Sequence, residues 1–134
     1  MRILVLDDMK LRHDAFDSIY ESHEVRHAYT YTEFMFMLTD GAPWDVLHLD
    51  HDLGDEVVDC DTYVDGWGHR CEFNGQHAVL RVCELREDQM PKTAVIIHSI
   101  NPSGAAAMKQ LLTRRVSMLP AEVQFRVVWQ PFDG

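Results

Sequence analysis

The sequence has no apolar run near the ~20 residues that a membrane-spanning helix needs, so no transmembrane segment is expected. The apolar run at residues 3–6 is also far too short for the core of a signal peptide, and no cleavage site follows it. The three cysteines are an odd number without a secretory signal, which favours free thiols over a disulfide framework. We therefore expect a complete cytoplasmic protein that does not bind membranes.

Basic residues are also scarce, with 12 Lys and Arg against 22 Asp and Glu and a formal net charge of −10. Such a chain repels the phosphate backbone of nucleic acids, so nonspecific nucleic-acid binding is disfavoured. A small phosphorylated ligand is compatible with this charge if a metal ion holds it, because a local cation overrides the mean charge of the chain. Nothing in the sequence fixes the oligomeric state.

What the chain does contain is enough apolar residues for one folded core. With 134 residues, 46% of them hydrophobic, it is expected to form a single domain spanning residues 1–134. Short, β-prone apolar runs predict strands at residues 2–6, 24–29, 46–49, 93–97 and 123–129. Apolar residues at helical spacing predict helices at about 10–21, 33–39, 76–88 and 102–116, the second of them capped by Thr32. Residues 55–75 are acidic and glycine-rich with no clean period, which predicts an irregular loop or lid inserted after the third strand.

The alternation of strands and helices predicts the fold class. It implies an α/β architecture, a five-stranded parallel sheet with helices on both faces. In such sheets, binding and catalytic sites form outside the C-terminal ends of the strands. Polar residues follow three of the predicted strands at those ends, at 7–8, 50–52 and 98–101. If the first, third and fourth strands are neighbours, as in flavodoxin-like sheets, these residues converge on one site.

Four aspartates of these groups would place carboxylates at the same edge of the sheet: Asp7, Asp8, Asp50 and Asp52. Carboxylates this close repel one another and raise one another's pKa unless a cation lies between them. We therefore predict a hard divalent ion, Mg²⁺ or Mn²⁺, bound by oxygen ligands and retaining waters for a phosphate. The alternative is that the aspartates cap helices or solvate strand ends without binding a metal.

Histidines next to these carboxylates add acid–base chemistry that a magnesium site does not require. His51 and His98 can titrate near neutral pH, so either is a candidate general acid or base, and Asp52 joins them as a candidate catalytic residue. A hydrogen-bonded histidine at the end of a strand is the alternative for His98. A nucleophilic role for Ser99 is disfavoured, because no Gly-x-Ser-x-Gly elbow surrounds it.

Neighbouring residues supply groups for binding a phosphate. Ser99 and Asn101 offer neutral hydrogen bonds to a phosphate or a ribose. Gly104 lies in the first turn of a predicted helix whose free N–H groups favour an anion. Arg12, one turn into the first helix, would reach over the same edge to clamp a phosphate; a place on a solvated helix face is the alternative.

The insert carries two further candidates. Cys60, His69 and Cys71, with His77 in the following helix, offer zinc ligands, but their spacings match no compact zinc motif. The Gly-Trp-Gly run at residues 66–68 places an aromatic ring between two glycines. There it would either stack on a base or pack on the surface.

Residues 3–8, Ile-Leu-Val-Leu-Asp-Asp, resemble the opening of the CheY-like receiver domains of response regulators, whose acidic pair holds magnesium. Residues 49–50 resemble the end of the third receiver strand, which carries the phosphoacceptor aspartate, and Ser99 falls where receivers keep Ser or Thr. Residues 130–132 are similar to the terminal Lys-Pro-Phe motif of receivers. Gln130 replaces the lysine that contacts the phosphoryl group there, which argues against the usual phosphorylation switch.

Two further motifs are not needed by a phosphoacceptor. Asp-His-Asp-Leu-Gly at residues 50–54 and His-Ser-x-Asn at residues 98–101, together with Asp7, Asp8 and Arg12, resemble the cyclic-phosphate-processing receiver domains of bacteria and phages. This resemblance implies a flavodoxin-like fold and a location in a bacterial or phage-infected host cytosol. It also implies hydrolysis of a cyclic phosphate or phosphodiester of a nucleotide-derived small molecule.

The leading hypothesis is therefore a metal-dependent phosphoesterase whose partner is a small phosphorylated nucleotide-like ligand. A phage origin would imply removal of a nucleotide immune signal. The first alternative is a receiver-like module that binds a nucleotide ligand or a protein partner without chemistry. The second alternative is a phosphorelay receiver that is phosphorylated on Asp50.

Overall fold

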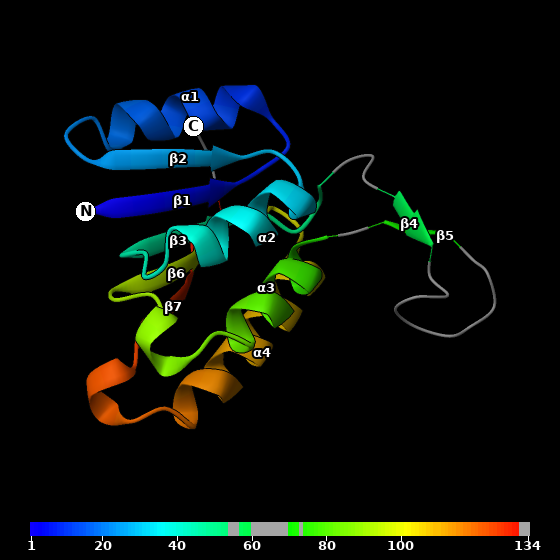
Figure 1. The fold of residues 1–134 in the computed structure, drawn as a ribbon. Helices are drawn as coiled ribbons and strands as arrows, with labels where there is room; N and C mark the ends of the chain where they lie inside the picture. The colour runs from blue at the N-terminus through cyan, green and yellow to red at the C-terminus, as the bar shows by residue number, and fades with distance from the viewer. Residues whose placement is uncertain (54–56, 60–69, 73, 132–134) are drawn as a thin grey trace.

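The computed structural model describes residues 1–53, 57–59, 70–72 and 74–131. Its centre is a five-stranded, all-parallel sheet in the order β2-β1-β3-β6-β7. The strands are β1 (Arg2–Leu6), β2 (Glu24–Ala28), β3 (Val46–Leu49), β6 (Ala94–Ile97) and β7 (Arg126–Trp129). This order confirms the flavodoxin-like prediction and makes β1, β3 and β6 neighbours (Figure 1).

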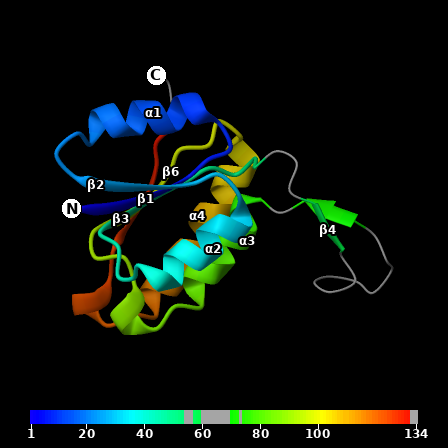
Figure 2. The ribbon, with the colours of Figure 1, turned by 45° about the horizontal axis from the view of Figure 1, so that its top comes forward.

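Four α-helices in the described part of the chain cover the two faces of the sheet unequally. They are α1 (Lys10–Ile19), α2 (Tyr31–Asp40), α3 (Gly75–Cys83) and α4 (Pro102–Ser117). Figure 2 shows α1 on one face and α2, α3 and α4 together on the other, which confirms the prediction of helices on both faces. None of the helices within the described ranges is long and apolar enough to cross a membrane.

The alternation of side chains along each strand sorts them between these two faces. Leu4 of β1 and Leu47 of β3 are fully buried in the larger core, against α2, α3 and α4. Ile3 and Val46 point the other way and pack with Phe16 of α1 in a smaller core. Because both faces of these central strands are buried, the strands read as continuous apolar runs in the sequence.

The predicted cap of α2 is wrong. The helix is capped by Thr30 and not by Thr32, because Thr30 is the last residue with an extended backbone before the helix begins. Its side-chain oxygen accepts a hydrogen bond from the N–H of Glu33 at 3.1 Å. This bond satisfies one of the helix N–H groups that have no partner within the helix.

Replacing Thr30 with alanine is expected to destabilise the protein by about 1 kcal/mol, because the N–H of Glu33 loses its acceptor. The matched substitution Thr32→Ala, inside the first turn, is expected to cost less. Urea denaturation of both variants gives the comparison. A larger loss for Thr32→Ala would contradict the assignment of the cap.

Two other predicted boundaries are wrong because the chain forms i→i−3 hydrogen bonds there. α3 ends at Cys83, before the expected limit at 88, since its last N–H groups bond to carbonyls three residues earlier. β7 begins at Arg126, after the expected start at 123, since residues 121–123 form a 3₁₀ turn. The remaining ends agree with the predictions within two residues.

The sequence predicted a wholly irregular insert after β3. The structure instead contains two short strands in it. β4 (Val57–Asp59) pairs antiparallel with β5 (Arg70–Glu72), and both strands are three residues long (Figure 1). Strands of this length are too short to show a periodic pattern in the sequence, which explains the error.

The zinc alternative falls mostly on residues that the structure does not describe. Cys60, His69 and the side chain of Cys71 lie outside the described residues, as does the aromatic run at 66–68. His77 is described, and its Nδ1 accepts the N–H of Asn74 at 3.0 Å in the capping box of α3.

Candidate functional site

One row of residues crosses the C-terminal edge of the sheet on the face that carries α1. The parallel hydrogen-bond ladder continues one residue past the strands: Asp7, Asp50, His98 and Gln130 donate their N–H groups to carbonyls of neighbouring strands at 2.9–3.1 Å. Each of them lies two positions after a strand residue that faces α1, so the alternation of the extended chain turns all four toward that face. The structure thus brings together one residue from each of the three polar groups found in the sequence.

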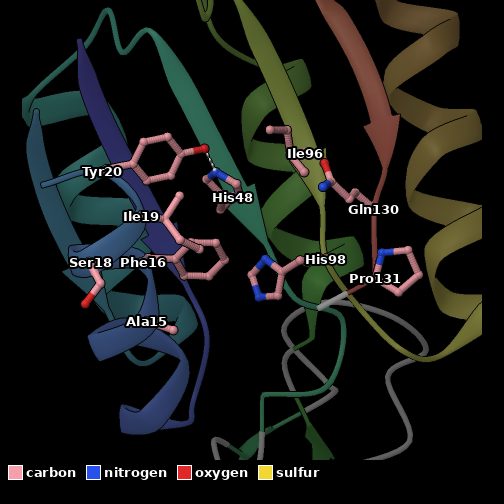
Figure 3. A pocket seen from close by; sticks show the side chains of 10 residues that line it. All are labelled: Ala15, Phe16, Ser18, Ile19, Tyr20, His48, Ile96, His98, Gln130 and Pro131. Atoms are coloured by element: carbon pink, nitrogen blue, oxygen red, sulfur yellow. Dashed lines mark hydrogen bonds between the residues drawn. The ribbon is translucent and has the colours of Figure 1, made fainter. Parts of the chain in front are cut away.

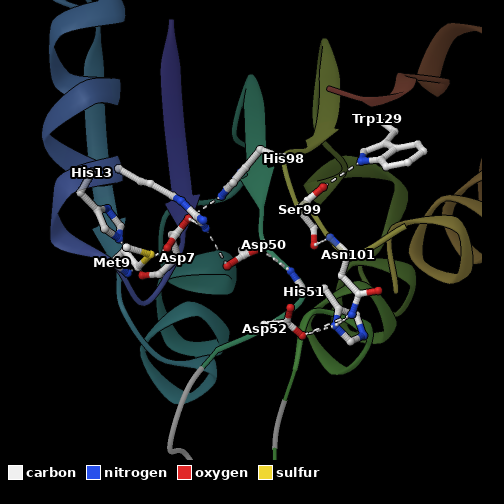
Figure 4. Close-up of polar contacts among 11 residues, drawn as sticks. Asp7, Met9, His13, Asp50, His51, Asp52, His98, Ser99, Asn101 and Trp129 are labelled. Atoms are coloured by element: carbon white, nitrogen blue, oxygen red, sulfur yellow. Dashed lines mark hydrogen bonds and ion pairs between the residues drawn. The ribbon is translucent and has the colours of Figure 1, made fainter. Parts of the chain in front are cut away.

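Asp7 is held by three hydrogen bonds. Its Oδ1 accepts the N–H of Met9 at 2.8 Å, and its Oδ2 accepts Nε2–H of His98 at 2.7 Å and Nη1–H of Arg12 at 3.1 Å (Figure 4). Burial alone would raise the pKa of Asp7, but the bonds from His98 and Met9 and the nearby positive charges outweigh it. The pKa of Asp7 is therefore lowered, and its carboxylate stays ionised.

Asp50 has the opposite electrostatic balance. Its Oδ1 accepts the N–H of His51 at 2.9 Å, and its Oδ2 shares the Nη1 of Arg12 at 3.3 Å. Burial and then the charge of Asp7 raise the pKa of Asp50 to about 6, against smaller opposing effects of His98 and Arg12. Two buried carboxylates thus share one guanidinium, and Asp50 carries its charge at a free-energy cost near neutral pH.

Arg12 does not lie on a solvated helix face. Its side chain is 16% exposed and bridges Asp7 and Asp50 through one nitrogen. The predicted role of clamping a phosphate stays a prediction.

Asp7, Asp50 and His98, here called the acidic cluster, are placed as ligands of a metal ion would be. One ligand atom from each lies within 4.8 Å of the others, and all three residues are buried. Two carboxylate oxygens and an imidazole nitrogen suit Mn²⁺, while Mg²⁺ prefers oxygen ligands throughout. Because the two carboxylates share one guanidinium, a divalent ion would relieve their repulsion, and the donor set fits such an ion.

Asp8 and Asp52, the other two predicted ligands, lie outside the acidic cluster. Asp8 is exposed, because successive residues of an extended chain point to opposite sides and Asp7 takes the buried one. The side chain of Asp52 is 64% exposed and bonds to His51. The predicted group of four carboxylates is therefore not assembled.

His51, Asp52 and Asn101 form a second polar group, joined to the acidic cluster through the peptide between Asp50 and His51. Oδ1 of Asp52 lies 2.8 Å from Nδ1 of His51 and accepts Nδ2–H of Asn101 at 3.5 Å (Figure 4). An ionised carboxylate can only accept, so Asp52 favours the tautomer with the proton on Nδ1 of His51. Gly104 makes room for the ring, because a Cβ at that position would overlap it.

Ser99, Asn101 and Gly104, predicted to bind a phosphate, are bonded to one another. Ser99 is buried, and its Oγ accepts the N–H of Asn101 at 3.0 Å. Asn101 caps α4, with its Oδ1 accepting the N–H of Gly104 at 3.0 Å. The cap therefore uses a first-turn N–H that the sequence assigned to an anion, and the phosphate-binding roles of these residues stay predictions.

Two buried histidines were missed by sequence reasoning. In α1, Nε2 of His13 donates to the carbonyl of Asp7 at 2.7 Å, which supports the backbone that carries the acidic cluster. In β3, Nε2 of His48 lies 2.6 Å from the hydroxyl of Tyr20. Burial lowers the pKa of both histidines, that of His48 to about 3. The sequence signal that could have identified them is their spacing, since each histidine lies at a core-facing position of its helix or strand.

Comparison with known proteins identifies a family whose model matches most of the chain. The family described as the cyclic-phosphate processing receiver domain matches residues 2–114. The chain belongs to this family. No curated protein sequence matches it.

Solved structures of response regulators share the fold of this receiver domain. A response regulator protein from Burkholderia pseudomallei, with a phosphorylated aspartic acid, calcium ion and citrate, is 14% identical at a TM-score of 0.59 over 98% of this chain and 61% of its own. The response regulator domain of Thermotoga maritima CheB is 18% identical at 0.60, over 98% and 78%. A CheY-like receiver domain protein from Methanospirillum hungatei JF-1 is 16% identical at 0.58, over 98% and 82%. At these identities the likeness shows the fold, and this chain spans less than two thirds of the Burkholderia protein.

Replacing Arg12 with alanine is expected to destabilise the metal-free receiver domain. Removing one partner of a buried ion pair costs about 3–5 kcal/mol, and we expect the lower end because Asp50 can take up a proton near pH 6. Mn²⁺ is expected to recover much of this loss by neutralising the two carboxylates. Thermal unfolding with and without the ion measures both effects.

The matched control for this prediction is Lys10→Ala, which removes an exposed cation from the same helix. Lys10 pairs with Asp14 at 3.0 Å on the surface, and such pairs contribute little. Equal losses from the two substitutions, or no recovery with Mn²⁺, would contradict the role given to Arg12.

Proposed function

We propose that this receiver domain is a divalent-metal-dependent phosphoesterase that acts on a cyclic phosphate or phosphodiester of a nucleotide-derived small molecule. The observation that carries the proposal is the buried acidic cluster, whose ligand atoms lie within 4.8 Å of one another. Membership of the cyclic-phosphate processing family supports the same chemistry. In a phage, such an enzyme would remove a nucleotide immune signal of the host.

The acidic cluster would hold the metal, Mn²⁺ or Mg²⁺. A bound ion of this kind supplies a polarised phosphoryl group and a water of lowered pKa. Arg12 bridges Asp7 and Asp50 in the structure, and with their charge neutralised it would be available to bind a phosphate oxygen.

His51 is the proposed general base. With Asp52 fixing the proton on Nδ1, Nε2 of His51 has a lone pair that takes a proton from the attacking water. The new P–O bond forms as the ester P–O bond breaks; the leaving oxygen takes up a proton from solvent water, and His51 returns the proton that it accepted to solvent. His98 is assigned to the acidic cluster and not to proton transfer, because it is 2% exposed and bonded to Asp7.

A phosphorelay role is the second candidate, and one observation favours it. Asp50 directly follows β3, where receivers carry their phosphoacceptor, and the similar Burkholderia response regulator contains a phosphorylated aspartic acid. Gln130 in place of the phosphoryl-contacting lysine weighs against it. A lasting aspartyl phosphate on Asp50 after treatment with acetyl phosphate would favour this role over hydrolysis.

Hydrolysis is tested by incubating the protein with Mn²⁺ or Mg²⁺ and a panel of cyclic nucleotides, cyclic oligonucleotides and ADP-ribose phosphates. We expect ³¹P NMR to show a new phosphomonoester that EDTA prevents. His51→Gln is expected to slow its formation about 10²-fold or more, whereas His23→Gln, at an exposed histidine, is expected to have no effect. Recovery of every ligand unchanged by a metal-loaded protein would contradict hydrolysis and favour a binding module.

A further inference from the structure

A cavity of about 330 Å³ lies between α1 and the sheet, next to the acidic cluster. Its apolar walls include Phe16, Ile96 and Pro131, and its polar lining includes His48, His98 and Gln130 (Figure 3). His98 belongs to both places, with Nε2 bonded to Asp7 and its ring on the cavity wall. The volume falls at the lower end of the range for small-molecule sites, about 300–1,000 Å³.

The cavity exists because α1 covers only part of its face of the sheet. Phe16 of α1 packs over β1 and β3. Among the described residues no other α-helix lies on this face, so β6 and β7 are left without a helical cover next to α1 (Figure 2). Ile96 of β6, in register with His48 of β3, forms the floor there.

Two buried imidazole nitrogens in the lining have no hydrogen-bond partner among the residues that the structure describes. They are Nδ1 of His48 and Nδ1 of His98, in residues that are 5% and 2% exposed. The Nε2 atoms of the same rings are bonded, to Tyr20 and to Asp7. A buried polar atom without a partner destabilises the protein, and a ligand that bonds to it recovers that free energy.

The lining determines which ligand would fit. It contains no Asp, Glu, Lys or Arg in the described part of the chain, so a phosphate or carboxylate would find no counter-charge there. Because Asp7 accepts Nε2–H of His98, the neutral ring has a lone pair on Nδ1 for a ligand donor. If the Tyr20 hydroxyl donates to Nε2 of His48, the Nδ1–H of that ring meets a ligand acceptor.

We propose that this cavity binds a neutral, planar heteroaromatic ring of the nucleobase class. In the metal-free protein an amino group of the ring donates to Nδ1 of His98, and a ring nitrogen accepts from Nδ1 of His48. A metal ion bound through Nε2 of His98 would leave the proton on Nδ1, which would then donate to a ring nitrogen. Phe16 and Tyr20 border the space with stacked aromatic rings, which favour a flat ligand. This binding is distinct from the proposed hydrolysis and does not require it.

The test is a titration of the metal-free, ¹⁵N-labelled protein with adenosine, followed through the histidine ring signals. Saturable shifts are expected at Nδ1 of His48 and of His98. His48→Phe keeps an aromatic ring and removes the nitrogen, and it is expected to weaken binding about tenfold. Ile96→Trp fills the cavity and is expected to abolish binding.

Met118→Trp is the matched control, because it adds the same indole at an exposed position at the end of α4. It is expected to bind adenosine as the wild type does. The proposal is overturned if adenosine shifts neither ring, or if Ile96→Trp keeps the wild-type affinity.

A second probe, adenosine 3′,5′-cyclic monophosphate, distinguishes two sources of the ring. Binding that is tighter than that of adenosine, dependent on Mn²⁺ and lost in Ile96→Trp would identify the ring as the base of the molecule whose phosphate reaches the acidic cluster. Equal binding of the two probes would identify a separate nucleoside site. Either result supports the cavity as a base-binding site.

Discussion

Asp50→Asn is expected to abolish most metal-dependent hydrolysis while making the metal-free protein more stable at pH 7.5. Loss of a pre-organised charge from a buried site costs on the order of 10²- to 10³-fold in kcat. The gain in stability follows from the raised pKa of Asp50, about 6 against 3.8 for an ordinary aspartate. At pH 7.5 the folded wild type pays about 2–3 kcal/mol to keep this buried carboxylate ionised, and asparagine does not.

The pH dependence of this gain has a definite sign. Between pH 3.8 and about 6, folded Asp50 holds a proton that the unfolded chain has released, so its contribution to stability is lost as the pH rises. The advantage of Asp50→Asn is therefore expected to shrink to about 1 kcal/mol at pH 4.5. Urea denaturation in EDTA at the two pH values measures it.

Asp88→Asn is the matched control, because Asp88 is exposed and pairs with Arg86 on the surface. It is expected to leave both activity and stability nearly unchanged. If Asp50→Asn lowered the free energy of unfolding at pH 7.5 and also lowered activity, the loss of activity would reflect misfolding and not a missing metal ligand.

His48→Phe is expected to make the protein markedly more resistant to acid. Burial, followed by the charge of His98, lowers the pKa of His48 to about 3, against 6.5 in the unfolded chain. Between these values the unfolded state binds a proton that the folded state does not, so this residue makes stability fall as the pH falls. At pH 4.5 the effect is about 2–3 kcal/mol relative to neutral pH, and phenylalanine removes it.

The two residues offset each other in the wild type, since Asp50 stabilises the folded state on acidification and His48 destabilises it. We therefore expect the free energy of unfolding to fall more steeply with acid in Asp50→Asn than in the wild type, and less steeply in His48→Phe. Phenylalanine retains the ring contact with Phe16, whose centroid lies 4.5 Å from that of His48. His23→Phe, at an exposed histidine, controls for the loss of an imidazole in general. Parallel curves for the wild type and His48→Phe would contradict this account.

Much of the candidate site was predictable, because its residues follow strands that can be recognised from short apolar runs in the sequence. Asp7, Asp50 and His98 each come directly after such a run, and a parallel sheet brings the ends of neighbouring strands to one edge. Asp8 and Asp52 were grouped with them by proximity in the chain. Asp8 is exposed because it points to the opposite side from Asp7, and the exposed side chain of Asp52 bonds to His51. Local bonds also decided the cap of α2, where two threonines satisfy the same sequence pattern and only the backbone of Thr30 has the required geometry.

The sequence by itself determined the sheet, its helices and the edge at which the polar residues gather, because hydrophobic periodicity and strand order depend on short-range patterns and general topology. Only the tertiary structure decided how the charges are shared. The bond between His98 and Asp7 joins residues 91 positions apart, and the bridge from Arg12 to Asp50 depends on how α1 packs on the sheet. The cavity beside His48 depends on the same packing, because unpaired buried nitrogens are defined by what surrounds them in space and not by their neighbours in the chain.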